Sequence, residues 1–406
     1  MGRMSADGAV SHARPLFMSG NEAVAWGARL ARPQVIAAYP ITPQTVVIER
    51  LSEWVAEGLL DSEFLHVESE HSALSACMGA SALGARSFTA TSSQGLLYMA
   101  ECLHYASGGR FPIVMMNANR ALALPWNIYG DQQDSLAVLS SGWIQIYIED
   151  AQEALDMSIQ AFAIAEHAEV LTPVMLNLDG FVLTHTYEPV EVPGQEDVDV
   201  FLPSFRTPSK MDLEAPTNMG FTAGPAHYTE FKVQQHRAML RASQVAAQVD
   251  EAFGQRFGRC YGGGVVPYRC GDADLVLVTL GSVAGLVRGV VDDLRAGGVA
   301  AGMLKLRFLR PFPEREIVQA LSGARAVGVL EKDVSFGNAG AVFSDVASTL
   351  ASTTIRPALL NFVAGLGGRD ISRDDVERMF DELRAACVQA PGERVRFVNV
   401  QESRDG

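Results

Sequence analysis

Short apolar segments alternate with helix-like segments along most of this 406-residue chain. This alternation is typical of parallel sheets whose two faces are both covered by helices. The first series of apolar segments covers residues 35–39, 64–67, 87–91, 112–117, 144–148 and 174–178, and the second covers residues 275–281, 301–306, 326–330 and 358–363. The pattern therefore predicts an α/β protein with two parallel-sheet domains.

The regions between the two series suggest the domain boundaries. Residues 1–16 carry no clear pattern and are expected to form an N-terminal arm, and a first α/β domain is expected over 17–188. Six of the 18 prolines lie between Pro189 and Pro225, and apolar residues then recur at helical spacing from Ala238 to Phe253. These features predict a Pro-rich excursion and a long helix over 189–257. The second α/β domain is expected over 258–395.

Composition excludes several classes of function. The net charge of −15 disfavours binding to nucleic acid or to an anionic membrane surface. The longest uncharged stretch, Pro33 to Ile48, contains three prolines, and the N-terminus lacks an apolar signal region. The expected compartment is therefore the cytoplasm. The five cysteines form no CxxC pair, and neither a P-loop nor a GxGxxG turn occurs, so no local cluster, metal or nucleotide motif is expected.

Polar residues follow several of the expected strands, at the sheet edge where ligands of α/β proteins bind. Thr42 could be the N-cap of a helix that Pro43 opens, or it could face an anion. Glu70 could simply favour a helix N-terminus, or it could be a buried carboxylate that polarises a ring nitrogen.

The other three candidates at this edge also leave alternatives open. Gln94 follows the expected strand 87–91. Arg120 stands alone as a charge between Phe111 and Gly130, so it needs Asp131, Asp134 or a ligand carboxylate as a partner. Asp179 is expected to be a turn residue or to pair with a nearby cation.

At these same positions the chain resembles a known family. The segments are AYPITPQT (38–45), ESEHSA (68–73), TATSSQGLLYM (89–99), NANRALALPWNIYGDQQD (117–134) and LDGF (178–181). They resemble the α subunit of 2-oxoacid:ferredoxin oxidoreductases. VTLGS (278–282), KLRFLRPFP (305–313) and AGLGGRD (364–370) resemble the same subunit's transketolase C-terminal-like domain. The resemblance implies a thiamine-diphosphate-binding fold of the pyrimidine type, followed by that second domain.

The resemblance also implies an activity and its cofactors. Family members convert a 2-oxoacid and coenzyme A to an acyl-CoA and CO2, and pass the electrons through iron–sulfur clusters to ferredoxin. The α subunit holds the aminopyrimidine end of thiamine diphosphate, and a β subunit supplies the diphosphate and Mg2+ site. No diphosphate motif of the GDG type occurs here, so this half of the site, the clusters and the metal are expected on β, ferredoxin-like and γ-type partners of a higher-order hetero-oligomer.

Residue roles follow from the matching motifs. Glu70 matches the glutamate that contacts the pyrimidine nitrogen and thereby promotes removal of the thiazolium C2 proton. Arg120 matches the arginine that meets the substrate carboxylate, with Thr42 beside it. Pro40, Thr42, Glu70 and Gln94 are expected to contact the cofactor, and no metal ligand is expected on this chain.

Pyruvate is the first choice of substrate, but Trp126 is bulkier than the small aliphatic residue expected after the proline. An aryl or branched-chain 2-oxoacid such as phenylglyoxylate, 2-oxoisovalerate or indolepyruvate is the alternative, with ferredoxin or a flavin/NAD module as acceptor. A lipoamide-linked 2-oxoacid dehydrogenase subunit and a scaffold subunit without chemistry are further alternatives. Retention of Thr42, Glu70 and Arg120 together argues against the scaffold.

Overall fold

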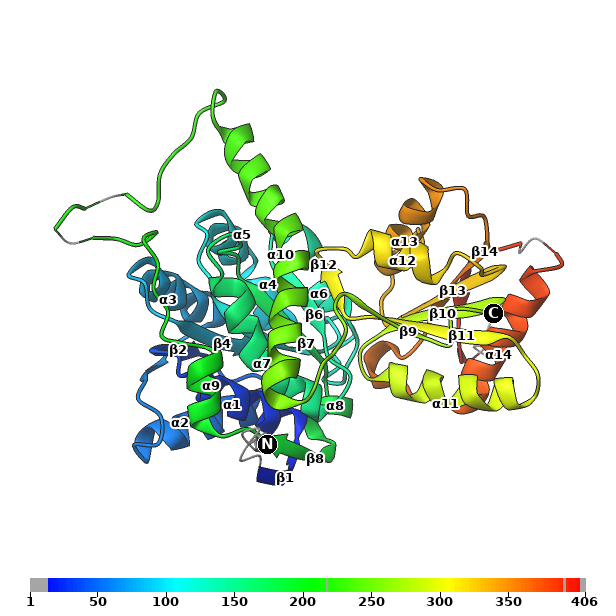
Figure 1. Cartoon of the computed structure of the whole chain (residues 1–406), viewed down its shortest axis with the longest axis horizontal. Helices are drawn as coiled ribbons and strands as arrows, with labels where there is room; N and C mark the ends of the chain where they lie inside the picture. Colours follow the sequence, from blue (N-terminus) through cyan, green and yellow to red (C-terminus); the bar gives the residue numbers. More distant parts are fainter. Residues whose placement is uncertain (1–13, 213, 217, 390–391, 402–406) are drawn as a thin grey trace, which may run out of the picture.

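The computed structural model describes residues 14–212, 214–216, 218–389 and 392–401, and it consists of two α/β units side by side (Figure 1). The first unit contains a seven-stranded sheet in the order β12-β6-β7-β5-β4-β2-β3. Its strands are β2 (Val35–Ala38), β3 (Glu63–His66), β4 (Ser87–Thr91), β5 (Val114–Asn119), β6 (Ile144–Tyr147), β7 (Val174–Asp179) and β12 (Phe308–Arg310). All neighbours are parallel except β12, which pairs antiparallel with β6.

Helices cover both faces of this sheet, because alternate side chains of each buried strand point to opposite sides. On β5, Val114 and Met116 belong to the apolar cluster that includes α1 and α7, whereas Met115 belongs to the cluster that includes α3 and α5. The helices of this unit are α1 (Gly20–Ala31), α2 (Thr45–Ala56), α3 (Glu70–Ala82), α4 (Ser93–Tyr98), α5 (Ala100–Gly108), α6 (Gln133–Leu136), η1 (Leu139–Ser141), α7 (Ala151–Glu166) and α8 (Val182–His185).

The second unit has a six-stranded sheet in the order β15-β14-β13-β10-β11-β9. Its strands are β9 (Val265–Tyr268), β10 (Leu275–Leu280), β11 (Ala301–Leu306), β13 (Ala326–Glu331), β14 (Ala358–Val363) and β15 (Val395–Phe397). Residues of α11 (Val283–Ala296) and α14 (Arg373–Ala386) join one apolar cluster, and residues of α12 (Glu314–Ala320) and α13 (Ala341–Ala351) join another. The short helix η2 (Leu366–Gly368) follows β14. In this sheet the neighbouring strands are parallel except β9, which pairs antiparallel with β11. The mainly parallel sheets of both units confirm the predicted fold class.

The long helix α10 (Tyr228–Phe257) runs along the first unit, and its N-terminal turns project beyond it (Figure 1). Before it, the expected Pro-rich excursion contains more structure than the sequence pattern indicated. Strand β8 (Tyr187–Val192) pairs antiparallel with β1 (Arg14–Ser19), and α9 (Gln195–Phe201) follows. The boundaries drawn at 16/17 and 188/189 therefore both fall inside strands.

The expected N-terminal arm is thus wrong for residues 14–16, which are already in β1; the rest of that arm, residues 1–13, lies outside the described residues. Strands β9, β12 and β15 and helix α14 were not anticipated from the pattern. Helices α4 and α5 are separated by Met99 alone. Among the described helices, none combines the length and apolar character that crossing a membrane requires.

Candidate functional site

The candidate residues gather at one edge of the first sheet. Strands β2, β4, β5 and β7 are parallel, so their carboxyl ends lie at the same edge. The segments that leave β2, β4 and β5 carry Pro40 and Thr42, Gln94 and Arg120, and Asp179 is the last residue of β7. Glu70 follows the edge strand β3 and is the first residue of α3. The topology therefore places all six predicted polar and turn positions along this edge.

Thr42 does not cap a helix. Helix α2 begins at Thr45 with Gln44 at the N-cap position, so the helix start predicted at Thr42–Pro43 is wrong. The reason is a turn stabilised by side chains: Asn21 Nδ2 donates to the Pro43 carbonyl at 2.7 Å, and Gln44 Nε2 donates to the Tyr39 carbonyl at 2.9 Å. Thr42 is consequently exposed at the sheet edge, as is Pro40.

Arg120 lies beside Thr42. Its Nη1 donates to the Thr42 carbonyl at 2.9 Å, its Nε donates to the Asn127 carbonyl at 3.3 Å, and its guanidinium carbon lies 5.5 Å from the centre of the Trp126 ring. The side chain is buried, with 4% of the residue exposed, and this burial lowers the pKa of its guanidinium. Thr42 and Arg120, predicted to act together, are therefore in direct contact.

Neither acid suggested by the sequence pairs with the Arg120 guanidinium. Asp134 instead accepts from the backbone N–H groups of Arg120 at 3.1 Å and Ser93 at 3.0 Å, and from the Asn119 amide at 2.8 Å. Asp131 accepts from the backbone N–H groups of Gln133 and Gly367, both at 3.2 Å. Both carboxylates thus bind main chain and position the segment instead of neutralising the arginine.

Four other cations are buried in the described part of the chain, and each has a carboxylate partner. The pairs are Arg86–Glu166 at 2.6 Å, Lys305–Glu153 at 2.7 Å, Arg307–Glu153 at 2.5 Å and Lys332–Asp179 at 3.1 Å. Asp179 is therefore an ion-pair residue, one of the two alternatives predicted for it. Among these buried described cations, Arg120 alone has no carboxylate oxygen within 4.0 Å of its charged side-chain nitrogens.

Glu70 is buried next to the start of α4, with 7% of the residue exposed. A Cβ placed on Gly95 would lie 2.6 Å from Glu70 Oε1 and 2.7 Å from Thr91 Oγ1, so glycine there leaves room for the carboxylate. No hydrogen bond to Glu70 Oε1 or Oε2 occurs within the described ranges, and the buried Thr91 hydroxyl has none either. Sequence reasoning missed Gly95 and Thr91, although both lie inside the motif TATSSQGLLYM.

Gln94 is half-buried, and its Oε1 accepts from Ser93 Oγ at 2.6 Å. The same Ser93 hydroxyl lies 2.6 Å from the carbonyl oxygen of Ala121, the residue after Arg120. Helix α4 therefore contacts Glu70 through Gly95 and the Arg120 segment through Ser93. No ion pair or hydrogen bond joins Glu70 directly to Arg120 in the structure's described residues. Pro40 lies in the exposed turn after β2 and contacts neither residue through a hydrogen bond.

The residues present fit the aminopyrimidine end of thiamine diphosphate. A buried carboxylate and a hydroxyl, neither with a partner among the described residues, lie beside a glycine that keeps the space open. A carboxylate in this position can hydrogen-bond a ring nitrogen. In the described ranges, no group of three His, Cys, Asp or Glu side chains is arranged to hold a metal ion.

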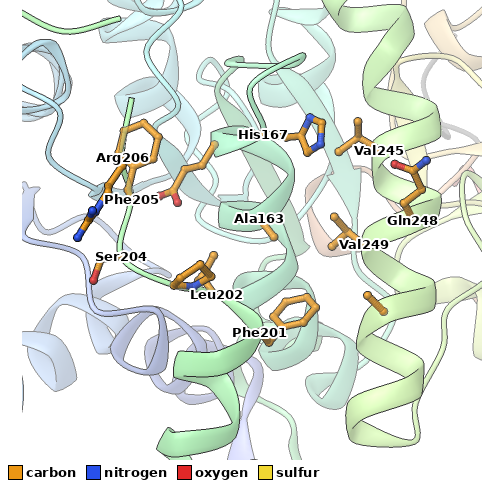
Figure 2. A pocket seen from close by; sticks show the side chains of 13 residues that line it. Ala163, His167, Phe201, Leu202, Ser204, Phe205, Arg206, Val245, Gln248 and Val249 are labelled. Atoms are coloured by element: carbon orange, nitrogen blue, oxygen red, sulfur yellow. The ribbon is translucent and has the colours of Figure 1, made fainter. Parts of the chain in front are cut away.

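A cavity of about 460 Å³ lies elsewhere in the first unit, between the end of α7, the segment after α9 and the middle of α10 (Figure 2). Ala163, Phe201, Val245 and Val249 line it, together with His167 and Arg206. Its lining includes none of the candidate site residues. The candidate site is therefore an open sheet edge and is separate from this cavity.

Two known protein families match this chain, and they define the class of protein. Residues 26–251 match the family described as "Pyruvate flavodoxin/ferredoxin oxidoreductase, thiamine diP-bdg", and residues 273–376 match "Pyruvate:ferredoxin oxidoreductase core domain II". The first match covers more than half of the chain and contains every candidate site residue. The chain therefore has the thiamine-diphosphate-binding domain of an oxidoreductase that acts on 2-oxoacids.

Individual relatives narrow this class. The chain is 48% identical over 388 residues to pyruvate synthase subunit PorA of Methanothermobacter thermautotrophicus, covering 96% of this chain and 99% of the relative. It is 49% identical over 372 residues to the PorA subunit of Methanocaldococcus jannaschii, covering 91% and 95%. Ketoisovalerate oxidoreductase subunit VorA of Pyrococcus horikoshii is 44% identical over 369 residues, covering 90% and 93%. This chain belongs to the 2-oxoacid:ferredoxin oxidoreductase family, and its relatives are subunits of the PorA type.

Solved structures agree on the fold. A 2-oxoglutarate:ferredoxin oxidoreductase from Magnetococcus marinus, solved with 2-oxoglutarate, coenzyme A and succinyl-CoA, matches with a TM-score of 0.69 and 20% identity. The match covers 91% of this chain and 65% of that one, so this chain spans just under two thirds of its length. A split-gene transketolase matches with a TM-score of 0.51 and 12% identity over 92% of this chain. The expected pairing of a thiamine-type domain with a transketolase C-terminal-like domain is confirmed.

Proposed function

We propose that this chain is the α subunit of a pyruvate:ferredoxin-type oxidoreductase, and that it holds the aminopyrimidine of thiamine diphosphate and the carboxylate of the 2-oxoacid. The reaction consumes a 2-oxoacid and coenzyme A, releases acyl-CoA and CO2, and transfers two electrons singly to an acceptor such as ferredoxin. Nearly full-length identity to PorA subunits supports this activity and favours pyruvate as the substrate.

One observation carries the proposed substrate site: Arg120 is a buried cation without a carboxylate partner in the described structure, although every comparable cation has one. Burying an unpaired charge is costly, so such a residue is retained where a ligand completes the pair. A guanidinium can bind a carboxylate through two parallel hydrogen bonds. Thr42, exposed beside it, offers a hydroxyl to the same ligand.

Glu70 has the second role in this proposal. Bound thiamine diphosphate supplies the carbanion-stabilising chemistry of the reaction. Glu70 is placed to hydrogen-bond a ring nitrogen and to hold or release a proton there, because its carboxylate is buried beside Gly95 without an internal partner among the described residues. The neighbouring Thr91 hydroxyl and the half-buried Gln94 orient the ring at the start of α4.

The partners follow from what the sequence lacks. We assign the diphosphate and Mg2+ site to a β subunit, and the iron–sulfur clusters to ferredoxin-like and γ-type subunits, since neither a GDG motif nor a CxxC pair occurs in this chain. We place the resulting hetero-oligomer in the cytoplasm. Relatives named as subunits support the multi-subunit form.

A branched-chain substrate is the second candidate, because the VorA relative is only slightly less similar than the PorA relatives. The bulky Trp126 is 69% exposed, and its ring lies next to the Arg120 guanidinium that we propose binds the substrate carboxylate. We rank pyruvate first, because the two PorA relatives are 48% and 49% identical to this chain and the VorA relative is 44% identical.

The test is turnover by the purified native complex with pyruvate, 2-oxoisovalerate, indolepyruvate, phenylglyoxylate and 2-oxoglutarate, each with coenzyme A and ferredoxin. Acyl-CoA formation identifies the products. We expect pyruvate to give the highest kcat/KM, and we expect the isolated chain to turn over none of the acids. A higher kcat/KM for another acid would overturn the substrate, and absence of any acyl-CoA would overturn the activity.

A further inference from the structure

The 121–130 loop directly follows Arg120 and carries one of the two groups that orient it. The loop is closed at its base by a hydrogen bond from Ala121 N to the Tyr129 carbonyl at 3.0 Å. Inside the loop, the Asn127 carbonyl accepts from Arg120 Nε at 3.3 Å. The position of the Asn127 backbone therefore helps to set the direction of the guanidinium.

Asn127 is fixed through its own side chain. Its Oδ1 accepts from Tyr129 N at 2.6 Å, inside the loop, and its Nδ2 donates to the Gly367 carbonyl at 3.0 Å. Gly367 belongs to η2 of the second unit, within the segment AGLGGRD, which resembles a family motif but has no role in the site described so far. The second unit thus holds the residue that orients Arg120.

The contact between the 121–130 loop and residues 365–368 is close at several points. Gly368 N donates to the Gly130 carbonyl at 2.8 Å, and Gly367 N donates to Asp131 Oδ2 at 3.2 Å. A Cβ on Gly367 would lie 2.5 Å from Asn127 Nδ2, and a Cβ on Gly368 would lie 2.4 Å from Tyr129 Cβ. Both glycines also have positive φ angles, 59° and 79°, which other residues rarely adopt. Only glycine permits this approach at either position.

We propose that the 365–368 segment of the second unit is a positioning element for substrate recognition, which acts through Asn127 on Arg120. This inference rests on the proposed role of Arg120 in binding the 2-oxoacid carboxylate. Asn127 and Gly367 are positioning residues, because they act through the guanidinium and not on the substrate. The second unit thereby contributes to substrate binding in addition to packing against the first.

The first test is Asn127→Ala in the co-expressed complex. Loss of the bond to Gly367 lets the Asn127 backbone move, so KM for the 2-oxoacid should rise about three- to tenfold, the factor that one neutral hydrogen bond supports. We expect kcat to stay within about twofold and the thiamine diphosphate concentration for half-activation to be unchanged. Partial unfolding alone would lower kcat and leave KM as it is.

The second test approaches the same contact from the other unit. Gly367→Ala should raise KM for the 2-oxoacid in the same way, because its Cβ would displace the Asn127 amide. Gly298→Ala is the matched control: Gly298 also has a positive φ, 83°, but a Cβ there meets nothing within 4 Å. The double variant Asn127→Ala/Gly367→Ala should be no worse than the more affected single variant, since both remove one interaction.

Unchanged KM in Asn127→Ala, or additive effects in the double variant, would overturn the inference. Should Gly367→Ala fail to assemble, the KM of Asn127→Ala decides alone. Arg120→Ala, measured in parallel, separates the two proposals. A strong effect of Arg120→Ala with none from Asn127→Ala overturns the positioning role only, whereas no effect from either variant overturns the proposed substrate site as well.

Discussion

Two regions of this molecule bury charge in opposite ways. Where α7 meets the second unit, Lys305 lies between Glu149 at 2.9 Å and Glu153 at 2.7 Å, and Arg307 also pairs with Glu153. At the edge of the first sheet, Arg120 and Glu70 are equally buried, but no described residue pairs with either charge. The charges at the junction are paired within the chain, whereas we propose that a ligand completes the pairing at the sheet edge.

Two opposing effects set the pKa of Glu153 at the junction, namely burial and the charges of its two cationic partners. Burial alone would raise it, but the charges of Lys305 and Arg307 outweigh burial and lower the pKa of Glu153 to about 2. Burial lowers the pKa of Arg120, and no carboxylate in contact reverses this. Burial of a charged side chain therefore does not by itself point to a functional site. A buried charge that lacks an oppositely charged partner is the more informative sign.

The largest effect is expected from Glu70→Gln, which keeps the shape and removes the acid. Activity should fall about 10²–10⁴-fold, the contribution of a proton-transfer group, while the complex still assembles. Exchange of the thiamine C2 proton for deuterium measures the step directly. Glu68→Gln is the control, since Glu68 is exposed and accepts from Ser72 Oγ. An unchanged exchange rate in Glu70→Gln would remove this residue from the mechanism.

Breaking the junction should instead cost stability. Lys305→Met removes a buried partner from Glu153 and Glu149, which should lower the free energy of unfolding by about 3–5 kcal/mol. Chemical denaturation of the complex measures it, with Lys232→Met on the exposed part of α10 as the control. KM for the 2-oxoacid should not change. A shifted KM with unchanged stability would reverse the roles assigned to the two regions.

Glu331 extends the comparison, because it is a buried acid that forms no ion pair with any described residue. Its carboxylate accepts from Val342 N, Phe343 N and Asn361 Nδ2, and burial raises the pKa of Glu331 to about 7 from an ordinary 4.5. The folded chain therefore retains this proton where the unfolded chain has lost it, so the group costs stability as the pH rises from 4.5 to 7.

The corresponding variant is Glu331→Gln. Between pH 5 and pH 8, the unsubstituted chain should lose about 2–3 kcal/mol of its free energy of unfolding through this group. The variant should not show this loss, so its stability relative to the unsubstituted chain should rise by the same amount. Denaturant titrations of both proteins at the two pH values provide the measurement. A difference that is independent of pH would show that Glu331 does not titrate in this range.

The smallest effect is expected from Thr42→Val. Arg120 contacts the Thr42 backbone carbonyl, so the substitution keeps that bond and removes only a hydroxyl. One neutral hydrogen bond to the substrate is worth about 0.5–1.5 kcal/mol, which should appear as a modest rise in KM. Steady-state kinetics with the 2-oxoacid measures it. A loss as large as that of Arg120→Ala would mean that Thr42 has a role beyond this contact.

Much of the fold could be predicted because its signals are local. The buried strand Ser87–Thr91 and the long helix that contains Ala238 to Phe253 both lie where the sequence indicated. Strand β12 could not be found in this way, since three residues carry no period and their partner is the distant strand β6. The pair of β1 and β8 was hidden because its two strands are distant in the sequence and β8 lies at the start of the Pro-rich region.

The residues of the candidate site could be proposed from the sequence, but their partners within the chain could not. The sequence left Asp131, Asp134 or a ligand carboxylate as the possible partner of Arg120. Only the folded chain shows that Asp134 accepts hydrogen bonds from backbone N–H groups and does not pair with the Arg120 guanidinium. Thr42 had the pattern of a helix cap, but Asn21 and Gln44 stabilise a turn there instead. The contact between Asn127 and Gly367 joins residues 240 positions apart, which no local pattern could indicate.

The central claim is that the Arg120 guanidinium is buried without a carboxylate partner among the described residues because the substrate carboxylate completes the pair. The most direct measurement is kcat/KM for the 2-oxoacid in Arg120→Ala, beside Arg110→Ala in the same co-expressed complex. Arg110 is the matched control, because its side chain also donates to backbone carbonyls, those of Val170 and Leu171, and burial lowers its pKa too, but it precedes β5 instead of following it. We expect Arg120→Ala to lose about 2–5 kcal/mol of transition-state binding, mainly through KM, and Arg110→Ala to leave KM unchanged. A kcat/KM within about threefold of the unsubstituted complex in Arg120→Ala would contradict the account.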